Sequence, residues 1–473
     1  MRKRIIIENL PIHGIADRGK GVGRTPEGMA VFVEGAVPGD VVNVQLQKKK
    51  ADFAEGYVAR IVTPSPERVA PFCKHFGLCG GCKWQYLRYA DQLKHKQQVV
   101  TDAFRRIAKI EPELTLPILG APEDTYYRNK LEFGFSNRRW LLDHEMDAEP
   151  ERPQDLYGLG FHKAGYFDKI IDIEHCWLQA EPSNSLRNAC RQIALEQGLE
   201  FYNLRTHTGY LRNIMVRTAT TGQNMLLLSV ARDQPKLLKP FLDAVLARFP
   251  ELTTIVYCVN TKLNDTFFDL QMHTWHGPGY IVEQLGNLRY KIGPKSFFQT
   301  NTRQAVVLYD TVLGFAELDG SQFVYDLYTG AGSIALYAAP HCRQVVGIEE
   351  VPEAIADAEE NKAMNGIHNA DFYCGDVKDV LTPEFTARYP RPDLVITDPP
   401  RAGMHEKAVR FLLDLAAPRI VYVSCNPATQ ARDTQLLSEK YALRKIRPVD
   451  MFPHTHHIEN VALFELAVEL STG

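Results

Sequence analysis

The chain has 473 residues, a formal net charge of −3, and 45% hydrophobic and 23% charged residues. These values exclude a disordered, collagen-like or coiled-coil chain, and the length predicts about two to four domains. The start, MRKRIIIENLPIHG, lacks the long apolar run of a signal peptide. No stretch of about eighteen apolar residues occurs either, so we expect a cytoplasmic protein without a membrane span.

Residues 1 to about 68 alternate short β-rich runs with turns that contain glycine and proline. This pattern predicts a small closed β-barrel of the OB type. Such barrels often bind single-stranded nucleic acid, and a barrel without a ligand is the alternative. A basic run, Lys48-Lys49-Lys50, fits either RNA or a solvated face. The stretch GVGRTPEGMAVFVEGAVPGDVVNVQL (21–46) resembles a TRAM domain, the β-barrel attached to RNA-modifying enzymes.

Three cysteines crowd one glycine-containing loop: Cys73, Cys79 and Cys82. Thiolates this close in a reducing compartment indicate a metal centre rather than disulfides. The fourth ligand must come from elsewhere, and Cys176 is the best-placed candidate. The first gap of five residues fits the paired spacing of zinc sites poorly, and a set of four thiolates also suits an iron–sulfur cluster, although zinc with His75 or His175 stays open. The gaps of five and two residues also differ from the Cys-x3-Cys-x2-Cys motif of radical S-adenosylmethionine enzymes.

Residues 91–110 predict an amphipathic basic helix, because apolar residues recur at close to helical spacing. The region from 111 to 290 predicts a mixed α/β domain. Basic and aromatic residues interleave at 126–130 and at 138–140, as a surface that stacks bases and holds phosphates requires. Core aromatic residues with incidental charges are the alternative.

From Ile292 onward strands and helices alternate, which predicts a doubly wound parallel sheet. The strand 323–327 leads into Gly330-Ala-Gly332, where the backbone can approach a cofactor. The next strand ends in Glu349, nineteen residues after Gly330, the offset at which a carboxylate takes ribose hydroxyls. A third fingerprint glycine is missing from the sequence, which argues against NAD and favours S-adenosylmethionine.

Further strand ends carry Asp376, suited to an adenine edge, and Asp398, before two prolines. The last motif is Ser424-Cys425-Asn426-Pro427, where an apolar run delivers Cys425 to a turn. A thiol at such a strand end can act as a nucleophile, whereas a buried structural cysteine is the alternative. Asp398 and Glu459 also have simple structural interpretations: Asp398 as a residue that caps the turn before two prolines, and Glu459 as a surface acid before the last strand.

Five motifs resemble, in order, those of the RNA uracil-5-methyltransferases: Ser296-Phe-Phe-Gln299, Asp326-Leu-Tyr328 with Gly330 and Gly332, Asp398-Pro-Pro-Arg401, Ser424-Cys-Asn-Pro427 and His457-Ile-Glu459. The cysteine loop and the TRAM-like start resemble the iron–sulfur branch of that family, which acts on 23S rRNA. The resemblance implies that Cys425 is the nucleophile and Glu459 the base. It also implies a cofactor and uracil pocket lined by Gln299, Tyr328, Gly330, Gly332, Ser333, Glu349, Asp376 and Asp398. The implied 4Fe-4S ligands are Cys73, Cys79, Cys82 and Cys176.

The sequence therefore predicts a TRAM-like barrel over 1–68, an iron–sulfur loop with a central α/β RNA-binding domain over 69–290, and a Rossmann-like methyltransferase domain over 291–473. The expected reaction is S-adenosylmethionine-dependent C5-methylation of a uridine in structured RNA, with 23S rRNA as the first candidate and tRNA as the alternative. An exocyclic-amine methyltransferase would need no thiol, so Cys425 argues against it. A non-catalytic RNA-binding factor is the third reading. No membrane and no obligate protein partner are expected.

Overall fold

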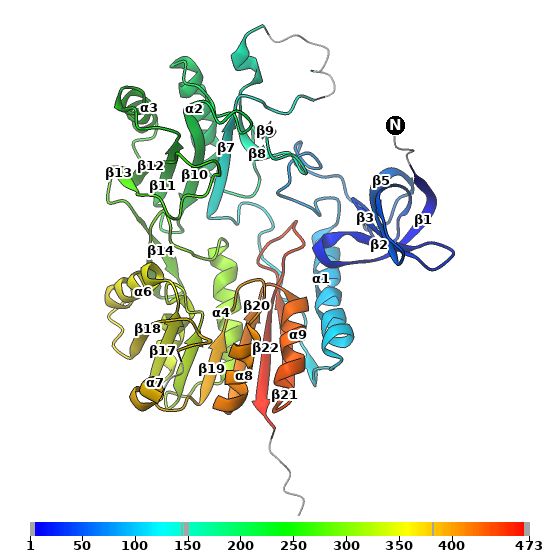
Figure 1. Ribbon diagram of the computed structural model, residues 1–473, viewed down its shortest axis with the longest axis vertical. Coiled ribbons are helices and arrows are strands. Elements are labelled where there is room, and N and C mark those ends of the chain that lie inside the picture. Colours follow the sequence, from blue (N-terminus) through cyan, green and yellow to red (C-terminus); the bar gives the residue numbers. More distant parts are fainter. Residues whose placement is uncertain (1–4, 143–144, 146–150, 381–382, 468–473) are drawn as a thin grey trace, which may run out of the picture. The chain divides into compact units, whose positions relative to one another are not determined.

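The structure, a computed structural model, describes residues 5–142, 145, 151–380 and 383–467. The chain forms two compact units that interleave along the sequence (Figure 1). The first unit holds Met1–Phe72, Lys83–Asp124 and Gln304–Gly473, and the second holds Cys73–Cys82 and Thr125–Arg303. No helix within the described ranges is both long and apolar enough to cross a bilayer.

A closed β-barrel opens the first unit, as the sequence predicts. Its strands are β1 (Ile6–Ile15), β2 (Gly21–Arg24), β3 (Ala30–Glu34), β4 (Val41–Lys49) and β5 (Phe53–Thr63), joined in the order β1-β2-β3-β5-β4. Alternate residues such as Val31 and Val33 face inward and are fully buried. Gly23 lies in a close crossing, where a Cβ would come within 2.6 Å of the Pro11 carbonyl oxygen.

An eight-stranded sheet forms the centre of the first unit. In spatial order its strands are β18 (Ala370–Cys374), β17 (Gln344–Glu349), β16 (Phe323–Leu327), β19 (Leu394–Thr397), β20 (Arg419–Ser424), β22 (Glu459–Leu466), β21 (Tyr441–Val449) and β6 (Leu114–Thr115). The neighbours from β18 to β20 pair in parallel, whereas β22 runs antiparallel to both β20 and β21.

From β16 the chain passes to β17 and then β18 on one side of the sheet, and it crosses back to place β19 and β20 on the other side of β16. The carboxyl ends of β16 and β19 therefore form a topological switch point, the place where open α/β sheets bind ligands. The pairing holds these ends together, since Leu327 lies opposite Thr397 and the Asp398 amide donates to the Leu327 carbonyl oxygen at 3.3 Å.

Helices cover the sheet and complete its core. They are α4 (Thr302–Ala316), α5 (Ser333–Ala338), α6 (Pro352–Met364), α7 (Pro383–Arg388), α8 (Glu406–Leu415) and α9 (Pro427–Leu437). Helix α1 (Tyr89–Ala103) comes from far earlier in the chain and ends in a π-helical turn, Phe104–Ala108, that packs on α9. Val100 and Phe104, both fully buried, join the sheet core. The basic helix predicted from the sequence is thus a structural part of the methyltransferase fold.

The second unit is built on a seven-stranded sheet with the order β13-β12-β11-β10-β7-β8-β9. These strands are β7 (Lys130–Ser136), β8 (Gly158–His162), β9 (Ile170–Asp172), β10 (Leu211–Thr218), β11 (Asn224–Val230), β12 (Thr254–Val259) and β13 (His273–His276). Helices α2 (Ser183–Glu196) and α3 (Pro235–Arg248) pack against each other, and β14 (Ile281–Leu285) pairs with β15 (Leu288–Ile292) as a separate hairpin. This is the mixed α/β fold that the sequence predicts.

Candidate functional site

Three side chains singled out in the sequence lie at one edge of the eight-stranded sheet. Asp398 directly follows β19, Cys425 directly follows β20, and Glu459 begins β22. Because β22 is antiparallel to β20, with Asn460 opposite Ser424, its first residue lies at the same edge as Cys425. A thiol and two carboxyl groups therefore meet beside the switch point of the sheet.

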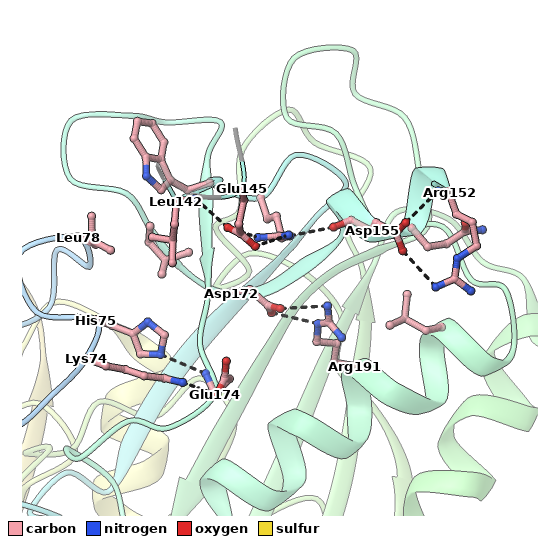
Figure 2. Close-up of a pocket in the computed structure, with 15 residues that line it drawn as sticks. Lys74, His75, Leu78, Leu142, Glu145, Arg152, Asp155, Asp172, Glu174 and Arg191 are labelled. Carbon is pink, nitrogen blue, oxygen red and sulfur yellow. Dashed lines mark hydrogen bonds and ion pairs between the residues drawn. The ribbon is translucent and has the colours of Figure 1, made fainter. Parts of the chain in front are cut away.

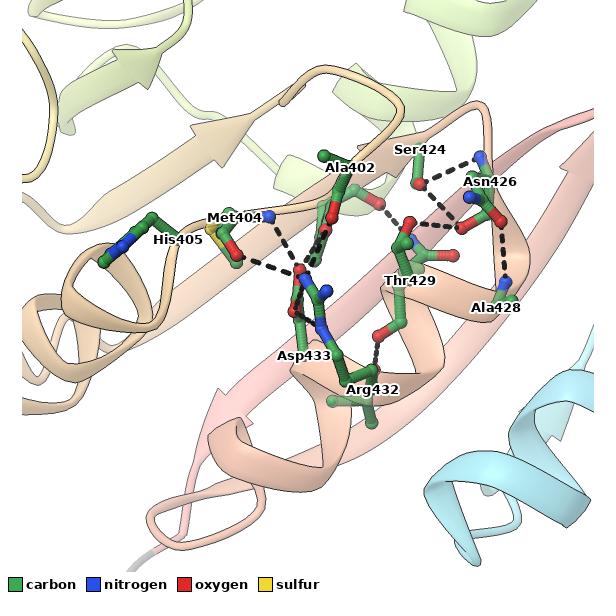
Figure 3. A network of polar contacts seen from close by, with 12 residues as sticks. Ala402, Met404, His405, Ser424, Asn426, Ala428, Thr429, Arg432 and Asp433 are labelled. Atoms are coloured by element: carbon green, nitrogen blue, oxygen red, sulfur yellow. Dashed lines mark hydrogen bonds and ion pairs between the residues drawn. The ribbon is translucent and has the colours of Figure 1, made fainter.

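A tight turn holds Cys425 between β20 and α9. The Ser424 hydroxyl oxygen accepts a hydrogen bond from the Asn426 amide at 3.1 Å. The Asn426 side chain accepts from the Ala428 amide at 3.1 Å and so caps α9, whose first residue is a proline. Its amide nitrogen Nδ2 donates to the Arg401 carbonyl oxygen at 3.0 Å (Figure 3). The turns after β19 and β20 are therefore tied together.

A buried carboxylate, Asp433, extends this connection. It accepts from the Met404 amide at 2.8 Å and from the Tyr422 hydroxyl at 2.7 Å. Arg432 pairs with Asp433 and donates to the Ala402 carbonyl oxygen at 3.0 Å (Figure 3). The loop that follows Arg401 is thus fastened to α9, which fixes the backbone on both sides of Cys425.

Burial controls protonation at this edge. Burial and the charges of Glu459 and Asp398 raise the pKa of Cys425 to about 12, while the Arg401 side chain, hydrogen-bonded to the thiol, lowers it. Burial raises the pKa of Asp398 to about 7. Burial, reinforced by Asp398, raises the pKa of Glu459 well above its ordinary range. Burial at this edge therefore favours the neutral thiol and the protonated forms of both carboxyl groups.

The glycine turn after β16 forms a cradle of backbone. Tyr328, Gly330 and Gly332 all have positive φ, at 63°, 55° and 77°. A Cβ on Gly330 would have no atom within 4 Å, so Gly330 faces open space, whereas a Cβ on Gly332 would come within 2.7 Å of the Phe372 ring. The Glu349 carboxylate accepts from the Gly330 amide and from the Val351 amide, each at 3.1 Å. The acid at the end of β17 is thereby held against the turn, and its expected contact with ribose hydroxyls stays a prediction.

Two residues near this turn were not assigned a role from the sequence. Asp326 is buried at the end of β16, accepts from the Thr329 hydroxyl at 2.5 Å, and has its pKa raised by burial to about 7. A hydrogen bond from the Ala335 backbone and the one from Thr329 oppose that effect of burial. Tyr309 of α4 shares a 2.9 Å hydrogen bond with the Ser333 hydroxyl. The motif around Asp326 was visible in the sequence, but Tyr309 lies in a helix without a motif.

The open space at Gly330 fits a polar nucleoside cofactor bound at the β16 turn. Asp376, at the third strand end, is paired with Lys378, whose hydrogen bond lowers its pKa. Gln299 belongs to the second unit, where its carbonyl oxygen accepts from Asn129 Nδ2 at 2.8 Å. Its expected place beside the cofactor stays a prediction.

All four cysteines of the expected cluster belong to the second unit. Cys73, Cys79 and Cys82 are partly exposed, whereas Cys176 is buried. Burial raises the pKa of Cys176, Arg187 lowers it, and the nearby Cys73 raises it further. Among the described side chains, however, no group of three or more His, Cys, Asp or Glu is arranged to hold a metal ion.

The cysteine loop is fastened to the segment that carries Cys176. Lys74 forms an ion pair with Glu174, and the Glu174 amide donates to His75 Nε2 at 3.4 Å. Cys79 forms an antiparallel bridge with Lys163. In donor chemistry, four thiols on two fastened segments fit an iron–sulfur cluster, although their side chains are not gathered into a ligand set.

A cavity of about 730 Å³ lies beside the cysteine loop (Figure 2). Its lining includes Lys74, His75, Trp140 and Glu174. Much of its charge is already neutralised within the wall, since Arg139 pairs with Glu145 and Arg191 pairs with Asp172. These ion pairs leave the cavity polar without making it an anion site.

Comparisons with known proteins agree with this geometry. A family model described as tRNA (Uracil-5-)-methyltransferase matches residues 385–466, and a TRAM domain model matches residues 3–59. An uncharacterized RNA methyltransferase of Bacteroides thetaiotaomicron is 50% identical, with 96% of this chain and all of that protein covered. One from Porphyromonas gingivalis is 49% identical over 96% of this chain and 99% of its own.

Among solved structures, the tRNA (uracil-54, C5)-methyltransferase of Pyrococcus abyssi in complex with S-adenosyl-L-homocysteine superimposes with a TM-score of 0.74. It is 29% identical and covers 96% of this chain and 99% of its own. Family models at both ends of the chain, full-length relatives and a full-length structural neighbour therefore agree. The chain belongs to the family of S-adenosylmethionine-dependent RNA uracil-5-methyltransferases.

Proposed function

We propose that the enzyme transfers a methyl group from S-adenosylmethionine to C5 of a uridine in 23S rRNA, through a transient covalent bond between the Cys425 sulfur and uracil C6. The observation that carries this proposal is the strand-end thiol beside Arg401, Asp398 and Glu459. A uracil C5 atom is a poor nucleophile by itself, and covalent catalysis divides one difficult step into easier ones.

In the first step the Cys425 thiolate bonds to C6, and the C5–C6 π electrons move to C5 and the O4 enolate. C5 then takes the methyl group from the sulfonium, whose carbon–sulfur bond breaks. Glu459, as the carboxylate, removes the remaining C5 proton. The electron pair re-forms the C5–C6 double bond and expels the Cys425 thiolate. The net products are the methylated base, the thioether and one proton.

This sequence requires two proton shifts before chemistry begins. Cys425 must lose its proton although burial holds its pKa at about 12. Arg401 supports the thiolate by its charge and its hydrogen bond. Glu459 must also ionise, although burial and Asp398 hold its pKa high. We infer that Asp398 keeps its proton when uracil is bound and donates a hydrogen bond to the polar edge of the uracil ring. Glu459 is then free to ionise and to act as the general base.

For the methyl donor we propose a site around the β16 turn. Gly330 and Gly332 allow the backbone to approach the cofactor, and Glu349 takes the ribose hydroxyls. Asp376 takes the adenine edge, and Tyr328, Ser333, Asp398 and Gln299 complete the wall. Support comes from the open space at Gly330 and from the Glu349 contact with that turn.

We further propose that the four cysteines bind a 4Fe-4S cluster. No step of the reaction needs electron transfer, so Cys73, Cys79, Cys82 and Cys176 would hold their two segments together as a structural element. The ion pair between Lys74 and Glu174 supports that role, because it already joins the same segments.

A tRNA uridine is the second candidate substrate. The observation that favours it is the similarity to the P. abyssi enzyme, which the comparison names as acting on uracil-54 of tRNA. The cysteine loop spacing and TRAM-like start favour 23S rRNA, because they resemble the branch of the family that acts there.

The test uses 5-fluorouracil-substituted total RNA and S-adenosylmethionine, analysed on a denaturing gel. Fluorine at C5 cannot leave as a proton, so the adduct should persist as a covalent band with the wild-type enzyme. Cys425→Ala should give no band, and sequencing of the trapped RNA should identify 23S rRNA. Trapped tRNA would select the second candidate, and a band with Cys425→Ala would overturn the assignment of the nucleophile.

A further inference from the structure

Two aromatic side chains project from the tip of the β8–β9 hairpin, residues 163–169, in the second unit. Tyr166 and Phe167 are 49% and 68% exposed. The turn is closed by the Lys163 amide, which donates to the Lys169 carbonyl oxygen at 2.8 Å. Gly165 adopts a φ of 82°, and a Cβ there would meet no atom within 4 Å. The tip is therefore an ordered turn that directs aromatic side chains away from the core.

Basic side chains surround these rings. The Arg205 guanidinium lies 5.9 Å from the centre of the Phe167 ring, and Lys163 Nζ lies 5.5 Å from the centre of the Trp140 ring. Trp140 in turn packs against Tyr166 with ring centres 5.1 Å apart. Alternation of cations and rings is what nucleic-acid surfaces use to hold phosphates and stack bases.

A buried carboxylate organises this surface. Asp168 is 2% exposed, forms an ion pair with Arg205, and lies 3.7 Å from Arg138. It holds both guanidinium groups on the surface while contributing little exposed negative charge. Lys163 and Lys169 add two further cationic side chains at the two ends of the same hairpin tip. The surface is therefore positive as well as aromatic.

We propose that this hairpin tip, with Tyr166, Phe167 and Trp140, is a stacking platform for unpaired bases of the RNA substrate. Base stacking on an aromatic ring is tolerant of sequence, since every base has a π face, and the surrounding cations pair with the phosphates. This inference rests on the proposed function and deepens it, because it names the single-stranded part of the RNA as a second recognised element. The target uridine itself is bound elsewhere, at the Cys425 edge.

The platform is joined to the cysteine loop. The Ala164 amide donates to the Leu78 carbonyl oxygen at 3.4 Å, and Lys163 bridges to Cys79. Trp140 also lines the cavity in Figure 2, so the platform borders that polar cavity. These contacts fix Lys163 and Ala164, the base of the hairpin tip, while the Tyr166 and Phe167 side chains stay exposed.

Binding of a fluorescein-labelled oligouridylate of about twelve nucleotides to the full-length protein tests the platform. Phe167→Ala combined with Tyr166→Ala should weaken binding by about 5- to 100-fold. Phe167→Trp keeps an aromatic face at this position, so its affinity for the oligonucleotide should stay within about twofold of wild type. Phe167→Leu lacks an aromatic face and should bind as weakly as Phe167→Ala alone. Phe268→Ala is the matched control, because Phe268 is 60% exposed in the same unit.

A second measurement locates the contact. Ultraviolet crosslinking of the bromouridine-substituted oligonucleotide should label the peptide that contains Tyr166 and Phe167. Unchanged affinity of the double variant, or crosslinks only elsewhere, would overturn the proposal. The binding assay does not depend on methyl transfer, because Cys425→Ala, which cannot form the adduct, should still bind oligouridylate. Failure of the platform and failure of the proposed reaction are therefore distinguishable.

Discussion

Lys96 Nζ and Asp450 Oδ1 lie 2.6 Å apart, and both side chains are at most 1% exposed. Tyr89 donates to the other Asp450 oxygen at 2.9 Å, and Lys96 also donates to the Phe452 carbonyl oxygen at 3.1 Å. Asp450 begins the loop that leads into β22 and Glu459. Helix α1 therefore holds the segment that delivers Glu459 to the sheet edge.

Lys96→Ala should lower the free energy of unfolding by about 3–5 kcal/mol, because Asp450 is left buried without its cation. Urea denaturation of the full chain measures this loss. Lys94→Ala, two residues earlier in the same helix but on its solvent-facing side, removes a pair with Glu67 in which the Lys94 side chain is 69% exposed, and should cost less than about 1 kcal/mol. Equal stability of the two variants would contradict the structural role of the buried pair.

Asn426→Ala should lower both the free energy of unfolding and the rate of adduct formation, because it removes the cap of α9 and the hydrogen bond to the Arg401 carbonyl oxygen. We expect a loss of about 1 kcal/mol in unfolding free energy and a 5-fluorouracil adduct that forms about 10- to 100-fold more slowly. Asn426→Ser should restore the cap but not the longer reach to Arg401. If the serine variant forms adduct at the wild-type rate, the Arg401 contact does not position the site.

Glu459→Gln should trap the enzyme on ordinary RNA after methyl transfer, since the amide cannot remove the C5 proton. Turnover should fall by about 10²- to 10⁴-fold, and a covalent protein–RNA band should appear without fluorine in the base. Glu465→Gln is the control, because Glu465 lies on the same strand, with its side chain 39% exposed. Normal turnover of Glu459→Gln without an adduct would refute its role as base.

Alkylation of Cys425 by iodoacetamide should rise with pH through pH 9 without reaching a plateau. The pKa of about 12 exceeds that of an ordinary thiol, so the thiolate fraction at pH 7 is about a thousandfold smaller. Arg401→Met should slow the reaction further, because the guanidinium lowers this pKa. Exposed Cys374 supplies an internal reference when both sites are followed by mass spectrometry. A Cys425 plateau near pH 8.5 would contradict the buried thiol.

Protein purified without oxygen should be brown and carry about four irons per chain. Cys176→Ser should lose most of the iron, because Cys176 is the proposed fourth ligand. Cys190→Ser is the matched control, since Cys190 is buried in the same unit but lies in α2. Colourless protein with stoichiometric zinc would replace the cluster with the zinc alternative.

The sequence predicts the parallel sheet well because its strands are buried on both faces and appear as continuous apolar runs. The ends of those runs coincide with Gly330, Glu349, Asp398 and Cys425 in the structure. The barrel was equally visible, since inward and outward residues alternate along strands such as β3. Local pattern was sufficient wherever a short segment determines both the strand and its turn.

Contacts between residues far apart in the sequence could not be predicted from such local patterns. Lys96 belongs to a helix that the sequence predicts to be amphipathic and basic, yet it is buried against a residue near the other end of the chain. Strand β6 has only two residues, too few for any periodicity. The protonation of Cys425 likewise depends on Asp398 and Glu459, which come from other strands. Each of these features exists only after the chain has folded.

The β-bridge between Lys163 and Cys79 joins the backbone of the cysteine loop to the backbone of the proposed stacking platform. Binding equilibria that share one element are thermodynamically reciprocal. If a bound cluster orders the base of the hairpin and thereby strengthens RNA binding, RNA held at the tip must stabilise the bound cluster by the same free energy. The enzyme would then be a redox-dependent RNA binder, whose affinity for substrate falls when oxidants destroy the cluster, even though the methylation chemistry involves no electron transfer.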